Sequence, residues 1–196
     1  MTLMKFAMTS SACAAALALA GCSTNTTNYP EAAPASIEAD GLATANDTAL
    51  PMMATASLKT ADGKDVGTVT ATAADGGINI SISVMGMTAG DHGVHIHTVG
   101  KCDAPAFESA GGHWNPGGAQ HGLSNPEGQH SGDMPSLTIA TDGTGKQDYA
   151  IKDAAFDRLL DADGAAIVIH AKPDDQMTDP SGDSGKRIAC GVLMKG

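Results

Sequence analysis

The sequence predicts an all-β protein, an antiparallel sandwich or flattened barrel of eight strands. Apolar and polar residues alternate in several short runs, of which Ile78 to Val84 is the clearest, and such alternation is typical of half-buried strands. Asp-Gly pairs, a strong hairpin signal, separate runs at 62–63, 75–76, 142–143 and 163–164. Many short strands joined by tight turns favour a sandwich or barrel over a helical or parallel architecture.

The alternating runs define eight expected strands in chain order. They span residues 54–60, 65–73, 78–85, 93–98, 136–140, 147–152, 165–170 and 187–194. Two long connections interrupt them, at 99–135 and 171–186, and one helical turn is expected within 154–160. Connections of this length are uncommon in a compact domain unless they carry function. We therefore expect two functional loops.

The chain divides into three expected segments. Residues 1–22 combine an early lysine with an apolar run too short to span a membrane, which is typical of a secretory signal. Their Leu-Ala-Gly-Cys ending resembles the bacterial lipoprotein cleavage site and implies that Cys22 becomes a lipidated N-terminus, with ordinary secretion and cleavage near Ala20 as the alternative. Residues 23–50 lack periodicity and are expected to be a flexible tether, and 51–196 form the folded domain.

Charge and cysteine content limit the class of protein. The 22 acidic residues outnumber the 11 basic ones, for a formal net charge of −11, and such a chain lacks the basic footprint of a nucleic-acid-binding protein. With Cys13 and Cys22 in the expected signal, the domain contains Cys102 and Cys190. Export favours a disulfide between these two, with a pair of buried free thiols as the alternative.

Most of the histidines gather in one stretch that ends at Asp133. Six of the seven lie there: His92, His95, His97, His113, His121 and His130. His95 and His97 are two positions apart on an expected strand, so their side chains point to the same face. The later members lie in a Gly-, Pro- and Asn-rich loop that a bound metal would help to order. Since imidazole is the commonest metal ligand in proteins, this pattern predicts a metal site.

The number of candidate ligands predicts two metal ions. Together with His170, which ends an apolar run, seven candidates exceed the four ligands of a zinc ion. They fall into a strand group and a loop group: His95, His97 and His170 in the first, and His121, His130 and Asp133 in the second. His113 lies between them in the chain and serves either group or bridges both. Imidazole suits zinc, copper, iron and nickel, so ligand chemistry leaves the metals open.

Four separated motifs resemble the copper/zinc superoxide dismutase family, in its exported bacterial branch. They are Gly93–His97 (GVHIH), Gly112–Pro116 (GHWNP), His130–Asp133 (HSGD) and Gly185–Gly191 (GKRIACG), and the match runs from about residue 54 to 194. The resemblance implies a Greek-key β-sandwich. It also implies dismutation of superoxide to oxygen and hydrogen peroxide, as antioxidant defence outside the cytoplasm, with copper and zinc as cofactors.

The resemblance also implies a role for each site residue. Copper would be held by His95, His97, His113 and His170. Zinc would be held by His113, His121, His130 and Asp133. His113 would thus be a catalytic bridge between the metals, whereas His92 would be a structural histidine and no ligand.

Further positions match residues that support the metals. Arg187 would be the catalytic arginine that attracts and orients the anion beside copper. Asp174 would link His95 to His121 as an outer carboxylate. The pair Cys102 and Cys190 would form the family's disulfide, which ties the first long loop to the last strand.

The expected partner is superoxide, and the expected location is the periplasm or cell envelope. Membrane contact would occur only through a lipid at Cys22, and Ser23 lacks the aspartate of an inner-membrane retention signal, which favours the outer membrane. The alternative function is a non-catalytic module that stores or delivers copper or zinc. Such a module would need neither the arginine nor the bridge. The sequence leaves the oligomeric state, monomer or homodimer, open.

Overall fold

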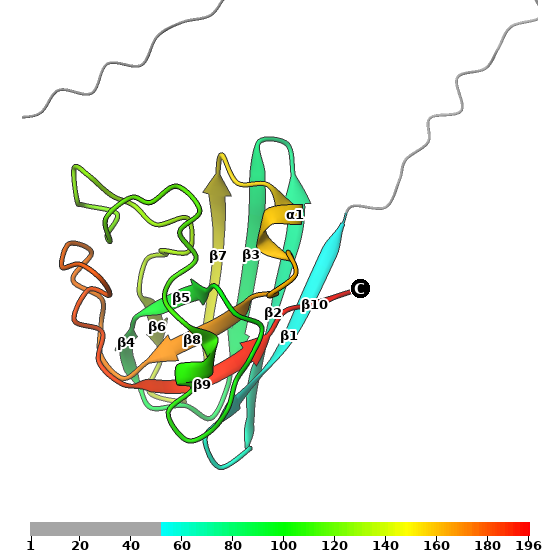
Figure 1. Ribbon diagram of the computed structural model, residues 1–196. Helices are drawn as coiled ribbons and strands as arrows, with labels where there is room; N and C mark the ends of the chain where they lie inside the picture. The colour runs from blue at the N-terminus through cyan, green and yellow to red at the C-terminus, as the bar shows by residue number, and fades with distance from the viewer. Residues whose placement is uncertain (1–51) are drawn as a thin grey trace, which may run out of the picture. The chain divides into compact units, whose positions relative to one another are not determined.

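The computed structural model describes residues 52–196 (Figure 1). The expected segments 1–22 and 23–50, and Cys22 with them, lie outside the described residues. Within residues 52–196 nearly all regular structure is β, which confirms the predicted fold class. No helix in this part of the chain is long and apolar enough to cross a membrane.

All eight expected strands are present; one of them, 187–194, is subdivided, and a further short strand, Gly90–His92, was not predicted. The strands are β1 (Met53–Thr60), β2 (Asp65–Ala74), β3 (Gly77–Val84), β4 (Gly90–His92), β5 (Val94–His97), β6 (Leu137–Ile139), β7 (Gly145–Lys152), β8 (Ala166–His170), β9 (Arg187–Val192) and β10 (Met194–Lys195). A 3₁₀ turn, η1 (Glu108–Ala110), lies in the first long loop, and the expected helical turn is α1 (Phe156–Leu159). The expected strand 187–194 divides at Leu193, which is buried and bonds to Ala165 O, whereas Met194 pairs with β1.

The strands form one large antiparallel sheet and one small one. The large sheet has the order β5-β8-β9-β1-β2-β3-β7, with β10 also paired to β1, and β4 pairs with β6. Because β4 runs directly into β5 and β6 leads through a tight turn into β7, the small sheet connects the two ends of the large one (Figure 1). This arrangement produces the expected flattened barrel.

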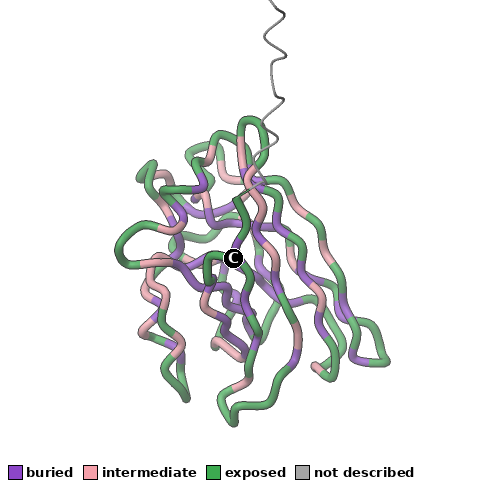
Figure 2. Tube along the Cα trace, turned by 90° about the vertical axis from the view of Figure 1, so that its right-hand side faces the viewer, coloured by how far each residue is buried: buried purple, intermediate pink, exposed green. Residues whose placement is uncertain are grey.

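The core lies inside this barrel, and alternation along the strands places it there. In β3, Ile78, Ile80 and Ile82 are fully buried, whereas the residues between them are exposed or only half-buried. The same alternation is visible along the neighbouring strands (Figure 2). Small and β-branched side chains fill the interior, as the aromatic content of 3% leads one to expect.

Strand β8 departs from this alternation, since all five of its residues are buried. Its Ile167 and Ile169 join the main core, whereas Ala166 and Val168 pack on the other face against Phe107 and Ala110 of the first long loop. The loop therefore covers the outer face of the sheet. The metal-site candidates lie on that same covered face.

Candidate metal centre

Three of the candidate histidines project from two paired strands, β5 and β8. β5 pairs with β8 so that His95 lies opposite Val168, and His170 ends β8 opposite Arg187 of β9. In β5, Val94 and Ile96 enter the core, so His95 and His97 point to the outer face that the loop covers. The sheet thus presents all three imidazoles beneath the loops.

The first long loop returns along the free edge of β5 and brings the next candidates with it. Ile96 accepts a hydrogen bond from Trp114 N (2.7 Å) and donates one to Gly132 O (2.9 Å). These bonds place His113 and Asp133 beside the strand, where His113 pairs with His97 and Asp133 with His95. Pairing at a sheet edge therefore positions loop residues next to strand residues.

Four ring nitrogens converge beneath the loops without a protein partner. His95, His97, His113 and His170 each offer an atom within 4.8 Å of the others. Each also has one buried ring nitrogen that makes no hydrogen bond: Nδ1 of His95 and Nε2 of His97, His113 and His170. Unpaired buried polar atoms are costly, and four lone pairs directed at one place suit a metal with imidazole ligands. The donor set therefore fits copper.

The opposite nitrogens of the three strand histidines are anchored. Nδ1–H of His97 donates to Gly111 O (2.9 Å), and Nδ1–H of His170 donates to Gly185 O (3.1 Å). Nε2–H of His95 donates to Asp174 Oδ2 (2.5 Å). Since a donor on one nitrogen leaves the lone pair on the other, these bonds select the tautomer that a metal requires.

A second group of four atoms has the spacing of a tetrahedral site. Asp133 Oδ1 lies 2.9 Å from His113 Nδ1, 3.0 Å from His121 Nδ1 and 3.3 Å from His130 Nδ1. His130 Nδ1 is also 3.3 Å from His113 Nδ1. Zinc bonds of about 2.0–2.1 Å in a tetrahedron separate ligand atoms by about 3.3 Å. These distances and the single carboxylate fit zinc.

His113 is common to both groups. Its Nδ1 faces Asp133 and His130, whereas its Nε2 is the unpaired nitrogen of the first group. His95 also offers an atom within 4.8 Å of His113, His121 and Asp133, but its Nε2 is engaged by Asp174. The ring of His113 therefore separates the two groups by the width of one imidazole.

Asp174 is a second connection between the two groups, beside the ring of His113. Its two carboxylate oxygens accept from His95 Nε2 and from His121 Nε2, the latter at 3.1 Å. Gly182 lies so close that a Cβ there would meet Asp174 Oδ1 at 1.8 Å. His92, expected to be structural, contacts the carbonyls of His170 (2.7 Å) and Thr88 (3.0 Å) with its two nitrogens.

Arg187 is held beside the first group by the loop backbone. Its Nη1 donates to Phe107 O and its Nη2 to Gly111 O, both at 2.7 Å. Gly111 O is also the acceptor for His97, so one carbonyl fixes both side chains. The sequence carries no signal for these carbonyls, because every residue has one.

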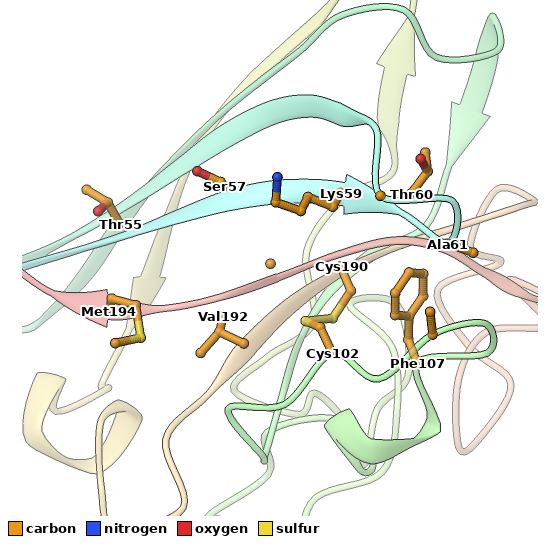
Figure 3. Close-up of a pocket in the computed structure, with 13 residues that line it drawn as sticks. Thr55, Ser57, Lys59, Thr60, Ala61, Cys102, Phe107, Cys190, Val192 and Met194 are labelled. Carbon is orange, nitrogen blue, oxygen red and sulfur yellow. A yellow bond between two sulfur atoms is a disulfide. The ribbon is translucent and has the colours of Figure 1, made fainter.

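The disulfide between Cys102 and Cys190 is present, with an S–S distance of 2.00 Å, which confirms the prediction. It ties the loop that carries Phe107 and Gly111 to β9, the strand on which Arg187 lies. Figure 3 shows the disulfide among the side chains that line a surface pocket, together with Lys59, Phe107 and Met194. The described part of this pocket contains none of the candidate ligands, so it is separate from the metal centre.

The pKa of His121 in the second group shifts in the opposite direction from those of His95 and His170 in the first, whereas burial lowers the pKa of His130 as well. Burial lowers the pKa of His95 to about 4 and that of His170 to about 3, so both are neutral at pH 7. Burial also lowers the pKa of His121, but hydrogen bonds to Asp133 and Asp174 outweigh it and raise the pKa to about 9. Burial raises the pKa of each of these carboxyls, yet their histidine partners hold it far below the usual range. Both carboxylates are therefore ionised.

The similarity of this chain to known proteins agrees with the geometry. The family model of copper/zinc superoxide dismutase matches residues 66–193. A copper/zinc superoxide dismutase of Caulobacter vibrioides is 44% identical over 147 residues, which cover 71% of this chain and 84% of that protein. A superoxide dismutase-like protein of Bacillus subtilis is 41% identical over 140 residues, covering 68% of this chain and 71% of the relative.

Solved structures share the fold. A superoxide dismutase-like protein from Bacillus subtilis superposes with a TM-score of 0.68 at 39% identity, covering 71% of this chain and 97% of that one. The copper/zinc superoxide dismutase of Brucella abortus gives a TM-score of 0.60 at 29% identity, covering 72% of this chain and 99% of that one. On the match of the family model and these identities, the chain belongs to the copper/zinc superoxide dismutase family.

Proposed function

We propose that this protein dismutes superoxide at a copper ion that shares a histidine with zinc. Copper would be held by His95, His97, His113 and His170, and zinc by His113, His121, His130 and Asp133. One observation carries this assignment: four unpaired ring nitrogens lie on one side of His113, and atoms with tetrahedral spacing lie on the other. The membership of the family supports the activity and the two metals.

When bound, copper would supply one-electron redox chemistry, by which one superoxide would lose an electron to become oxygen and a second would gain one and, with two protons, become hydrogen peroxide. Residues of the chain would orient the superoxide anion and transfer a proton to it. Arg187 uses two of its five N–H groups on loop carbonyls, and the remaining donors attract and orient the anion. We assign one proton transfer to Nε2 of His113. The contact of Nδ1 with Asp133 fixes the ring so that Nε2 is directed at the first group.

Positive charge near the copper site has to attract superoxide despite the negative net charge of the chain. The chain carries a formal net charge of −11, which repels an anion at long range. Screening limits such repulsion to roughly 8 Å at physiological salt, so the field near the copper site dominates the last approach. Arg187 is the residue to which we attribute that local attraction.

We further propose that the protein works in the cell envelope, anchored through a lipid on Cys22. The signal-like composition of residues 1–22 supports export, and the disulfide supports an oxidising compartment. Cys22→Ser should move the protein from the membrane fraction to the soluble fraction of the envelope. Retention of this variant in the membrane fraction would contradict the lipid anchor.

The first test measures copper and zinc per chain and the rate of superoxide loss in one sample. One copper and one zinc per chain, with fast turnover that stops when copper is removed, is the expected result. Full metal loading without turnover would instead favour the storage or delivery module, and would remove the role assigned to Arg187.

A further inference from the structure

Four of the six candidate metal histidines share one arrangement, and His113 and His130 depart from it in different ways. In His95, His97, His121 and His170, one nitrogen faces a metal group and the other donates to a carboxylate or a carbonyl. His113 uses both nitrogens on the metal groups. His130 directs Nδ1 at the second group, but among the described residues its Nε2 has no hydrogen-bond partner. Outer partners of this kind orient metal-binding histidines and raise their basicity.

Asp179 is the acidic residue that lies nearest to this open position. Its Oδ1 is 3.8 Å from His130 Nε2, which is too long for a direct hydrogen bond but suits one bridging water or a small closure. The same Oδ1 accepts the backbone N–H of His121 at 2.8 Å. Two members of the proposed zinc group therefore converge on one carboxylate oxygen.

The approach of Asp179 is built into the packing of the two long loops. Asp175 accepts the N–H groups of Met177 (2.9 Å) and Thr178 (2.8 Å), which forms the turn before Asp179. Gln176 O accepts from Ser124 N at 3.0 Å. The second long loop, orange in Figure 1, thus lies against the segment that carries His121.

Close contact between these loops requires a glycine. Gly122 has φ of +109°, and a Cβ at this position would meet Gln176 O at 2.2 Å. The backbone next to His121 therefore packs directly against the backbone that precedes Asp179. The carboxylate is held from its own turn and from the facing loop.

We propose that Asp179 is a positioning residue of the zinc site, holding His121 by its backbone and His130 by its ring. The inference rests on the proposed function, since it assumes zinc at the second group. It gives the short acidic loop 171–186 a second task beside that of Asp174. Asp174 connects the two metal groups, whereas Asp179 acts on the zinc group alone.

The test compares zinc and copper retention by three variants of the holo-protein. Asp179→Ala removes both contacts. Asp179→Asn keeps an amide oxygen for the His121 N–H but removes the charge near His130. Asp183→Asn is the matched control, because Asp183 is an exposed aspartate of the same loop and asparagine tolerates its φ of +48°. A competing chelator gives the zinc dissociation constant, and the visible spectrum of Co(II) in the zinc position reports ligand geometry.

Loss of an outer partner weakens metal binding by about 10- to 100-fold, so Asp179→Ala should raise the zinc dissociation constant by at least about tenfold. The asparagine variant should fall between it and the wild type, copper retention should not change, and the Co(II) spectrum should shift in the alanine variant but not in the control.

An alanine variant within about twofold of wild type would overturn the inference, given that outer partners are worth more than this. Parallel loss of both metals with a lower melting temperature of the metal-free protein would also overturn it, because the residue would then only stabilise the loop. If the wild type itself fails to retain zinc, the proposed function fails rather than the role of Asp179.

Discussion

The two halves of the metal centre differ in the structural elements that carry their ligands and in the groups that anchor them. Three ligands of the proposed copper half stand on paired strands, where backbone carbonyls of Gly111 and Gly185 anchor His97 and His170, and only His95 is anchored by a carboxylate, that of Asp174. The proposed zinc half stands on a long loop, and the carboxylates of Asp133 and Asp174 organise it. Carbonyl dipoles set direction without adding charge, whereas carboxylates add charge and favour protonated histidine. His95 and His170 of the copper half are therefore ready for a metal, whereas His121 of the zinc half must first lose a proton.

The contacts that hold each half in place also differ. The disulfide and the loop carbonyls hold the copper half together with Arg187. The second long loop holds the zinc half through Asp174 and Asp179, but it also anchors His95 and His170 of the copper half. The disulfide supports the copper half alone, so its loss should affect copper before zinc. The four predictions below test this separation.

Removal of the disulfide should have the largest effect. In the chain-entropy model, a bridge that closes 88 residues stabilises the folded state by about 4–5 kcal/mol at 25 °C. Cys102→Ser with Cys190→Ser should therefore lower the denaturation midpoint strongly. The copper half should weaken more, because Gly111 O and Phe107 O lie in the released loop. Metal analysis during a urea titration checks the order of loss, and zinc release before copper would contradict the separation.

Removal of His97, which serves copper alone, should affect one metal, whereas removal of the shared His113 should affect both. His97→Ala should abolish copper retention and lower dismutation by more than about 100-fold, since even outer partners are worth about 10- to 100-fold, and zinc should remain. His113→Ala should weaken both metals. Metal content per chain and superoxide loss measure both variants. Full zinc retention in His113→Ala would show that the histidine is not shared.

Zinc affinity should depend on pH through His121, whereas copper affinity should not depend on pH through His95. The pKa of His121 is raised to about 9, so below pH 9 zinc has to displace a proton, and affinity should rise about tenfold per pH unit from 7 to 9 before it levels off. The pKa of His95 is lowered to about 4, so copper displaces no proton from it in this range. Chelator competition at several pH values measures both slopes. A flat zinc curve would show that His121 is already neutral.

Arg187→Ala should have the smallest effect of the four. The rate of superoxide loss should fall about tenfold at low ionic strength, at the lower end of electrostatic steering, and its salt dependence should flatten. Metal content should not change, because the side chain bonds to carbonyls and to no ligand. Arg158→Ala is the control, since Arg158 is the other arginine of the chain and lies on α1. A wild-type rate in Arg187→Ala would exclude the steering role.

The strands were predictable because their signal is local. Alternation of apolar and polar residues reports which side of a strand is buried, and Ile78 to Ile82 follow it. The subdivision at Leu193 was not predictable, because it depends on a bond to Ala165 O across the sheet. The boundaries of the expected segments 1–22 and 23–50 stay predictions.

The sequence by itself determined that a dense set of imidazoles and one aspartate would meet, since no other use suits so many histidines in a short stretch. It also allowed the division into strand and loop ligands. Only the tertiary structure decided which nitrogen of each ring is free, because Gly111 O, Gly185 O and Asp174 select the tautomers from distant parts of the chain. The place of Asp179 beside His130 also depends on how two loops pack. Such contacts join residues far apart in sequence, and no local pattern encodes them.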